Sequence, residues 1–337
     1  MAGAYKPAEL GLGRCAISMK ILFVTATRIG DAVLSTGLLA YLVGRYPDAG
    51  FTVAAGPLAA PLFEAVPRLD RLIALDKQSF ARHWLRLYLA AAGTRWDLVV
   101  DLRGSALSYL LRAKQRRIVA KGAIDEHRVQ QLGRLFQLDP PPSPKLWLNP
   151  SHVARAASLL PPGGPVLAIG PAANWRGKEW RAERFAELAA RLTSPSGPLL
   201  GARVVIMAAA HERDQAAPVI AALPRERTVD LVGNVDLLTA AAVLARAALF
   251  VGNDTGLMHI AAASGAPTLG LFGPSVVAQY APWGKRAETV ATATPYLELF
   301  RPGWDRMTTD SMMDSLSVDM AEAGARRLLA RIAAERA

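Results

Sequence analysis

The chain has 337 residues, of which 52% are hydrophobic and 20% charged, so it is long enough to form two domains with substantial cores. Its single cysteine, Cys15, excludes an internal disulfide and any cysteine-rich metal centre. The net charge of +11 is concentrated in residues 1–150, which carry 20 Lys and Arg against 11 Asp and Glu; this imbalance predicts an anionic partner, and an arginine-rich surface without a partner is the alternative.

Short β-branched runs alternate with longer helical segments along the chain, a pattern typical of parallel sheets covered by helices. In the first half the pattern predicts strands at 21–25, 51–54, 72–75 and 98–100, and helices at 32–45, 81–92, 105–112 and 125–136. In the second half it predicts helices at 153–160, 182–191, 214–222, 236–246, 256–264 and 320–335, and strands at 166–169, 204–207, 249–251 and 268–272. Proline-rich segments at 139–144 and 161–165 separate two doubly wound α/β domains.

The chain ends and the apolar runs predict a cytoplasmic protein. Residues 1–18 lack a continuous apolar run and precede the first strand, so we expect a flexible extension and no signal peptide. The apolar stretch 237–251 is interrupted by Arg246 and is too short to span a bilayer.

The first turn that could carry chemistry is 25–31, between the first strand and the first helix. It has neither a GxGxxG pattern nor a Walker lysine, which excludes the usual dinucleotide and NTPase loops. Asp31 follows Gly30 at the start of the helix, where an acid is commonly an N-cap or a first-turn acid stabilised by the helix dipole. The same dipole would keep Asp31 ionised, as a general base requires.

Two turns in the second half are suited to an anion. At 251–259 a strand ends and Asp254-Thr255-Gly256 opens a helix, so free backbone N–H groups can bind a diphosphate; His259 lies in that helix and is alternatively a core histidine. In the loop 169–180, Lys178 can neutralise phosphate, or it is an ordinary surface lysine.

Two patterns of metal binding are missing. The sequence contains no Asp-x-Asp pair, and its five histidines do not have metal-ligand spacing. A leaving diphosphate would therefore be stabilised by lysine, arginine and helix N-termini.

Motifs at 21–39, 178–180, 252–259, 271–275 and 312–319 occur in the order found in the ADP-heptose:lipopolysaccharide heptosyltransferases. The chain thus resembles glycosyltransferase family 9 over about residues 19–335. The resemblance implies a GT-B fold of two facing Rossmann-like domains with parallel sheets. Residues 19–160 would bind the acceptor, 161–319 the nucleotide sugar, and the helix in 320–337 would pack back toward the N-terminal domain.

The resemblance also implies an activity. It is the metal-independent, inverting transfer of a heptose from ADP-L-glycero-D-manno-heptose to the inner core of lipopolysaccharide or a lipid A–Kdo acceptor. The enzyme would need no cofactor and would contact the cytoplasmic face of the inner membrane peripherally.

The family's functional positions map onto residues of this sequence. Asp31 matches the catalytic base. The matching donor-binding positions are Lys178, Asp254, Thr255, Gly256 and His259, with looser matches at Glu212 and Asn174. Acceptor binding is assigned to the basic residues Arg103, Arg112, Arg116, Arg117 and Lys121, which alternatively form a solvated face.

Two alternatives stay open. Ala173-Asn174 replaces hydroxyl residues that touch the donor in other family members, so the same fold could use another nucleotide sugar or another envelope glycan. A basic nucleic-acid-binding protein is the alternative of another class; the charge is not interleaved with aromatic residues, so no nucleic-acid partner is expected.

Overall fold

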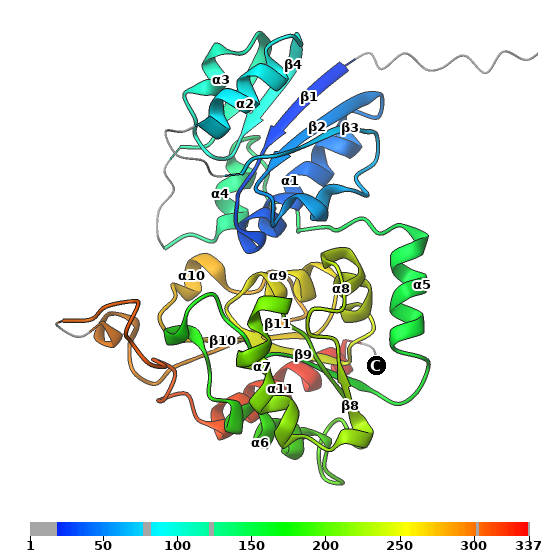
Figure 1. The fold of residues 1–337 in the computed structure, drawn as a ribbon, viewed down its shortest axis with the longest axis vertical. Coiled ribbons are helices and arrows are strands. Elements are labelled where there is room, and N and C mark those ends of the chain that lie inside the picture. The colour runs from blue at the N-terminus through cyan, green and yellow to red at the C-terminus, as the bar shows by residue number, and fades with distance from the viewer. Residues whose placement is uncertain (1–18, 77–81, 121–124, 301–302, 336–337) are drawn as a thin grey trace, which may run out of the picture.

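The computed structural model describes residues 19–76, 82–120, 125–300 and 303–335, and its elements form two α/β domains stacked along the long axis (Figure 1). The predicted N-terminal extension, residues 1–18, lies outside the described residues. Each domain contains one parallel sheet, and the two domains are the facing Rossmann-like units of a GT-B fold.

The N-terminal domain has a five-stranded sheet in the order β3-β2-β1-β4-β5. Its strands are β1 (Met19–Val24), β2 (Ala49–Ala55), β3 (Leu69–Ala74), β4 (Trp96–Asp101) and β5 (Ala113–Ile118). Its helices are α1 (Ile29–Arg45), α2 (Arg82–Ala91), α3 (Leu107–Leu110) and α4 (Arg128–Arg134). The two faces of the sheet are covered by different helices because side chains alternate along each strand: Ile21 and Phe23 pack with α1, whereas Leu22 and Val24 pack with α2.

The C-terminal domain has a six-stranded sheet in the order β11-β10-β9-β6-β7-β8. Its strands are β6 (Val166–Gly170), β7 (Arg203–Ile206), β8 (Thr228–Asp230), β9 (Leu249–Asn253), β10 (Thr268–Phe272) and β11 (Ala287–Ala291). The helices of the second half are α5 (Pro150–Leu159), α6 (Ala182–Thr193), α7 (Arg213–Ala222), α8 (Leu237–Leu244), α9 (Gly256–Ala263), α10 (Val277–Tyr280) and α11 (Val318–Ala334). Helix α5 connects the domains and packs on α8. Residues 150–159 therefore pack with the C-terminal domain, although the expected boundary lay at residue 160.

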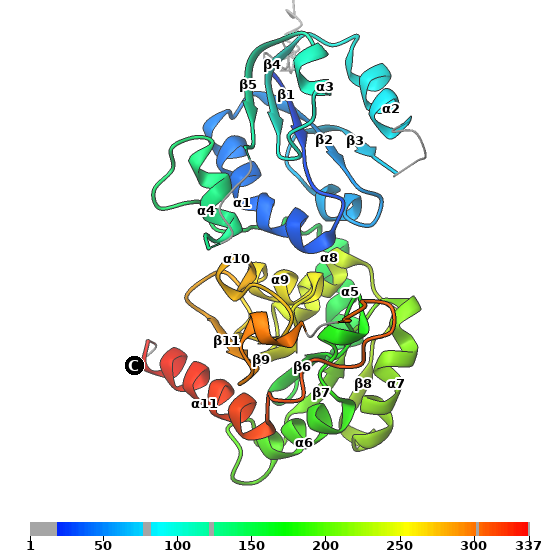
Figure 2. The same cartoon turned by 90° about the vertical axis from the view of Figure 1, so that its left-hand side faces the viewer.

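The largest apolar core does not stop at the domain boundary. It joins Leu38 and Leu42 of α1 to Val243 of α8 and Ile260 of α9. Helices α1 and α9 are in direct contact, and Figure 2 shows them facing each other between the two sheets. The carboxyl end of each sheet is thereby turned toward the other domain.

Two predictions about the elements are wrong. The helix expected at 105–112 is the single turn α3, and the chain then forms the strand β5. The C-terminal helix α11 does not pack toward the N-terminal domain; it lies against α6, β10 and β11. The physical reason is its apolar face, because Ala325, Leu328 and Ile332 join the core that contains Leu269 and Val290.

Candidate active site

The order of the strands in each sheet indicates where a ligand would bind. In an open parallel sheet, ligands bind beyond the carboxyl ends of the strands where the strand order reverses. That point lies between β1 and β4 in the first domain and between β6 and β9 in the second. The turns after these four strands carry Asp31, Arg103, Lys178 and Asp254.

The N-termini of α1 and α9 meet at the domain interface, and two glycines permit the contact. A Cβ atom on Gly256 would lie 2.7 Å from Ile29 Cγ2, and one on Gly30 would lie 2.9 Å from His259 Cδ2. Each helix N-terminus presents backbone N–H groups without intrahelical partners and the positive end of a dipole. Their meeting point is therefore electrostatically suited to an anion such as a diphosphate.

Asp31 lies in the first turn of α1, half-buried. It is not a cap, because α1 begins at Ile29 and its N-cap position is Arg28. Burial raises the pKa of Asp31, and this effect outweighs the opposing charges of Arg128 and Arg28. Asp31 is thus a first-turn acid of α1, and its raised pKa is the property of a carboxylate that readily accepts a proton.

Lys178 and Asp254 form an ion pair on the C-terminal side of the interface. Lys178 Nζ lies 2.5 Å from Asp254 Oδ2, and the two side chains are only 19% and 9% exposed. Both groups act on Asp31 electrostatically, Asp254 raising its pKa and Lys178 lowering it. The first domain's carboxylate and the second domain's ion pair therefore share one electrostatic environment.

Asn253 fixes the loop that carries Lys178. Its Nδ2 donates to the carbonyl of Pro171 at 2.7 Å, and its Oδ1 accepts the N–H of Trp180 at 3.2 Å. Because Asn253 is the last residue of β9, these bonds tie the β6–α6 loop to the turn that contains Asp254. Lys178 is thus held from both sides.

His259 is buried in α9 beside this ion pair. Burial lowers its pKa to about 4, so the ring is neutral at neutral pH. Its Nε2 lies 3.9 Å from Asp254 Oδ1, and its Nδ1 has no hydrogen-bond partner among the described residues. The ring therefore contributes packing and a neutral polar edge near the interface, and no positive charge.

The remaining predicted donor residues differ in their surroundings. Thr255 occupies the N-cap position of α9 without a capping side-chain bond, so its hydroxyl is not used by the helix. Asn174 is exposed in the β6–α6 loop. Glu212 accepts the N–H of Ala209 at 2.8 Å, which commits one carboxylate oxygen to holding its own turn.

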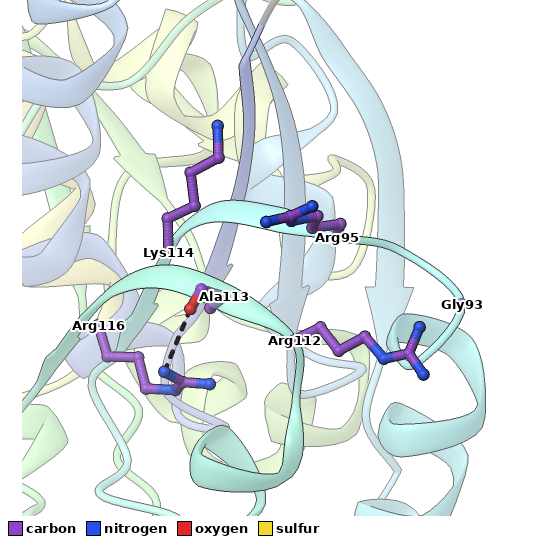
Figure 3. A pocket seen from close by; sticks show the side chains of 6 residues that line it. All are labelled: Gly93, Arg95, Arg112, Ala113, Lys114 and Arg116. Carbon is purple, nitrogen blue, oxygen red and sulfur yellow. Dashed lines mark hydrogen bonds between the residues drawn. The ribbon is translucent and has the colours of Figure 1, made fainter.

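The predicted acceptor residues are not brought together. Arg112 directly precedes β5, whose first residue pairs with the first residue of β4, so Arg112 lies at the amino edge of the sheet. Asp31 follows the opposite, carboxyl edge, roughly 17–20 Å away for a strand of this length. Arg116 donates to main-chain carbonyls, that of Ser108 at 2.8 Å and that of Ala113 at 3.3 Å, the second of which Figure 3 shows. These two residues do not lie beside Asp31, because the segment expected to be a helix is an edge strand that carries them away.

Two other predicted acceptor residues lie nearer the carboxyl edge. Arg103 follows β4 and stacks over Trp84 at 4.4 Å, and its buried Nη1 has no hydrogen-bond partner among the described residues. Arg117 is exposed near the end of β5, 5.7 Å from the ring of Phe136. Lys121 lies outside the described residues.

Three residues at the interface were missed in the sequence. Arg28 and Arg128 are the two strongest positive influences on Asp31, and Tyr280 has a raised pKa, caused first by burial and then by the charge of Asp31. Arg28 lies within the turn singled out at 25–31, so position alone could have found it. Arg128 and Tyr280 come from α4 and α10, and only the folded chain places them there.

The sequence pattern of glycosyltransferase family 9 (heptosyltransferase) matches residues 102–301. The chain belongs to this glycosyltransferase family. It is similar to lipopolysaccharide heptosyltransferase 2 of Salmonella typhimurium, with 26% identity over 316 residues that cover 82% of this chain and 89% of the relative. It is also 26% identical to lipooligosaccharide heptosyltransferase 2 of Haemophilus influenzae, over 78% of this chain and 86% of that protein.

Solved structures of family 9 enzymes share its fold. A glycosyl transferase family 9 protein from Veillonella parvula superposes with a TM-score of 0.77 at 20% identity, covering 93% of this chain and 97% of the other. The ADP-heptose LPS heptosyltransferase II of E. coli superposes with a TM-score of 0.74 at 20% identity, over 93% and 99% of the two chains. These similarities agree with the GT-B fold expected from the sequence.

Within the described ranges, no three His, Cys, Asp or Glu side chains are grouped to hold a metal ion. In the same part of the chain, no helix is long and apolar enough to cross a membrane.

Proposed function

We propose that this family 9 glycosyltransferase moves a heptose from ADP-L-glycero-D-manno-heptose to the inner core of lipopolysaccharide, with inversion at the anomeric carbon. One observation carries the proposal: the half-buried carboxyl of Asp31 lies within electrostatic range of the Lys178–Asp254 pair, where the N-termini of α1 and α9 meet. The relatives' names support the choice of sugar and glycan, and the geometry supports a base close to an anion site.

The proposed chemistry needs one base and one stabilised leaving group. Asp31 takes the proton of the acceptor hydroxyl as that oxygen bonds to the anomeric carbon of the donor. The bond between that carbon and the diphosphate oxygen breaks on the opposite face, and ADP leaves. Lys178 and the N–H groups at the start of α9 stabilise the charge that develops on the diphosphate.

We propose that no metal takes part, because protein cations can supply the positive charge that the leaving diphosphate needs. The site combines Lys178 with Arg28 and Arg128, all within electrostatic range of Asp31. Transfer should therefore continue at an unchanged rate after treatment with excess EDTA and gel filtration. Loss of activity that Mg²⁺ or Mn²⁺ restores would overturn this part of the proposal.

The main test compares Asp31→Asn with wild type. Purified enzyme should release ADP from ADP-heptose only when a lipid A–Kdo acceptor is present. Asp31→Asn should lower kcat by roughly 10²–10⁴ because the amide cannot accept the proton, while donor binding persists. Asp48→Asn, an exposed position after α1, is the matched control and should be fully active. Retained turnover in Asp31→Asn would refute the base.

A second test addresses the donor, since Ala173-Asn174 leaves open another nucleotide sugar on the same fold. Binding to the folded state raises the free energy of unfolding by about 2.7 kcal/mol at one hundred times Kd. ADP should therefore raise Tm more than UDP or GDP at equal concentration, and ADP-heptose should be turned over while other ADP-sugars are not. Stronger stabilisation by UDP or GDP would favour the alternative donor.

The proposed acceptor implies that the enzyme works at a membrane surface. A lipid-anchored acceptor at the cytoplasmic face of the inner membrane requires peripheral contact by the enzyme, and the basic first half suits anionic lipid. Such contact should weaken as salt rises.

A further inference from the structure

We propose that the outer surface of α2 and α3, together with the basic pocket beside them, docks on an anionic phospholipid bilayer. This inference rests on the proposed function, because the acceptor would be anchored in that bilayer. The surface, called here the α2–α3 surface, comprises Leu85, Arg86 and Leu89 of α2, Tyr109 and Leu110 of α3, and Arg95 between α2 and β4.

The first observation is the concentration of exposed apolar side chains. Leu89 and Leu110 are each 69% exposed, Tyr109 68% and Leu85 57%. Leu85 and Leu89 are four residues apart and thus share one face of α2. Both helices cover the same face of the sheet, where Leu87 and Leu111 point inward to the core. The exposed side chains are therefore the outward side of a well-packed layer, and apolar groups in such a position commonly mark a binding surface.

The second observation is the positive charge beside these side chains. A pocket of about 460 Å³ is lined by Arg95, Arg112, Lys114 and Arg116 at the amino edge of β4 and β5 (Figure 3). Arg95 and Arg112 form no hydrogen bond or ion pair through their guanidinium groups within the described part of the chain; Lys114 is paired with Asp97 at 2.6 Å. Arg86 adds a further exposed cation on α2.

Exposed apolar side chains beside arginines are the features that an anionic bilayer would bind. Leucine and tyrosine side chains enter the boundary between headgroups and acyl chains, and flanking arginines bind anionic headgroups. In Figure 1, α2 and α3 lie on the left of the N-terminal domain and α5 joins the domains on the right. A bilayer against this surface is on the side away from the connecting helix.

The test measures binding to vesicles without any acceptor. Wild type should co-sediment with vesicles of phosphatidylglycerol and phosphatidylethanolamine, less at high salt, and not with phosphatidylcholine alone. Arg86→Gln with Arg95→Gln should lower the partition coefficient roughly 25-fold, since each surface cation contributes about fivefold. Leu85→Ser with Leu89→Ser should lower binding by at least as much.

The matched control is Val153→Ser with Arg155→Gln on α5, which replaces an exposed apolar residue and an exposed cation on the opposite side. This variant should bind vesicles like wild type. All variants should keep wild-type kcat/KM toward a deacylated, water-soluble acceptor, and the α2 variants should have a raised KM only for vesicle-bound acceptor.

The outcomes separate this proposal from the proposed function. Wild-type binding by the α2 variants, or equal loss in the α5 control, would overturn the docking surface. So would variants that change the oligomeric state while vesicle binding stays intact, because the surface would then bind a second copy. Absence of heptose transfer to the soluble acceptor would refute the function and leave the vesicle result standing.

Discussion

Asp31, the base in the proposed reaction, lies in an unfavourable environment for its charge. Its pKa is raised above 3.8 by burial, so the ionised form is less stable in the folded protein than in the unfolded chain. The stability contributed by this group is present below pH 3.8 and is lost as pH rises through the raised pKa. A residue kept in such a place is one whose function outweighs its effect on stability.

Replacing this charge should therefore stabilise the protein. Asp31→Asn should raise the free energy of unfolding by about 1 kcal/mol at neutral pH, which corresponds to a Tm increase of about 1–2 °C for a chain of this length. The gain should shrink as pH falls through the raised pKa of Asp31, because the wild-type carboxyl is then protonated and uncharged. Thermal unfolding of both proteins between pH 4 and pH 8 measures this difference. A variant that is less stable than wild type at pH 8 would contradict the argument.

Arg128 should set the acid side of the pH–activity profile. Among the charges that act on Asp31, Arg128 lowers its pKa most. In Arg128→Gln the pKa of Asp31 should rise further, so the acid limb of kcat/KM should move to higher pH. Arg155→Gln, an exposed arginine on α5, should leave the limb in place. A limb that moves to lower pH in Arg128→Gln would show that another group titrates.

At the scale of elements, one glycine in α1 decides how closely the interdomain segment can pack. A Cβ on Gly37 would lie 2.2 Å from the carbonyl oxygen of Pro142 and 2.7 Å from the carbonyl carbon of Ser143. The same segment is tied to α1 by the N–H of Lys145, which donates to Thr36 Oγ1 at 3.0 Å. The atoms that an added Cβ would meet belong to the backbone of Pro142 and Ser143, so no flexible side chain can move aside to make room.

Gly37→Ala should lower the free energy of unfolding by about 1–3 kcal/mol, as overpacking does elsewhere. Gly44→Ala is the control on the same helix, because nothing lies within 4 Å of its added Cβ. That change should stabilise by about 0.5–1 kcal/mol through helix propensity. Urea denaturation of the two variants gives both numbers, and equal effects at the two positions would contradict the packing argument.

The strands that the sequence pattern missed are all at sheet edges. β5, β8 and β11 each have one neighbour, whereas the correctly predicted central strands β1, β4, β6 and β9 have two. Central parallel strands are buried on both faces and so consist of apolar runs that the sequence makes visible. An edge strand can be charged, and β5, with Lys114, Arg116 and Arg117 in its six residues, has no apolar pattern to detect.

The residues of the candidate site could likewise be predicted only where they follow a strand with a clear apolar pattern. Asp31, Lys178 and Asp254 follow strands whose pattern is clear, and the rule for parallel sheets brings the ends of such strands together. Arg128 and Tyr280 come from short helices that the domain packing places near Asp31, and no local pattern encodes that packing. The acceptor assignment of Arg112 and Arg116 stays a prediction, and only their separation from Asp31 was unforeseen, because the chain forms β5 where the pattern predicted a helix.

At the scale of the whole molecule, the two domains are also connected by a neutral histidine. His127 Nδ1 accepts the N–H of Val129 at 3.1 Å, which leaves a proton on Nε2 to donate to the carbonyl of Ala281 at 2.9 Å. Its ring packs against that of Trp283 with centroids 4.6 Å apart and a tilt of 39°, and burial lowers the pKa of His127. The link between α4 and the C-terminal domain is therefore intact at neutral pH.

The apolar core that runs from α1 into α8 and α9 has a consequence for how the molecule melts. Separating the halves would expose the contact between α1 and α9, including Ile29 where it packs on Gly256, so neither half keeps its full hydrophobic stabilisation alone. Calorimetry should therefore show a single endotherm whose van't Hoff and calorimetric enthalpies agree. Residues 19–149 expressed alone should bind ANS and aggregate. Two resolved endotherms would mean that the halves unfold autonomously.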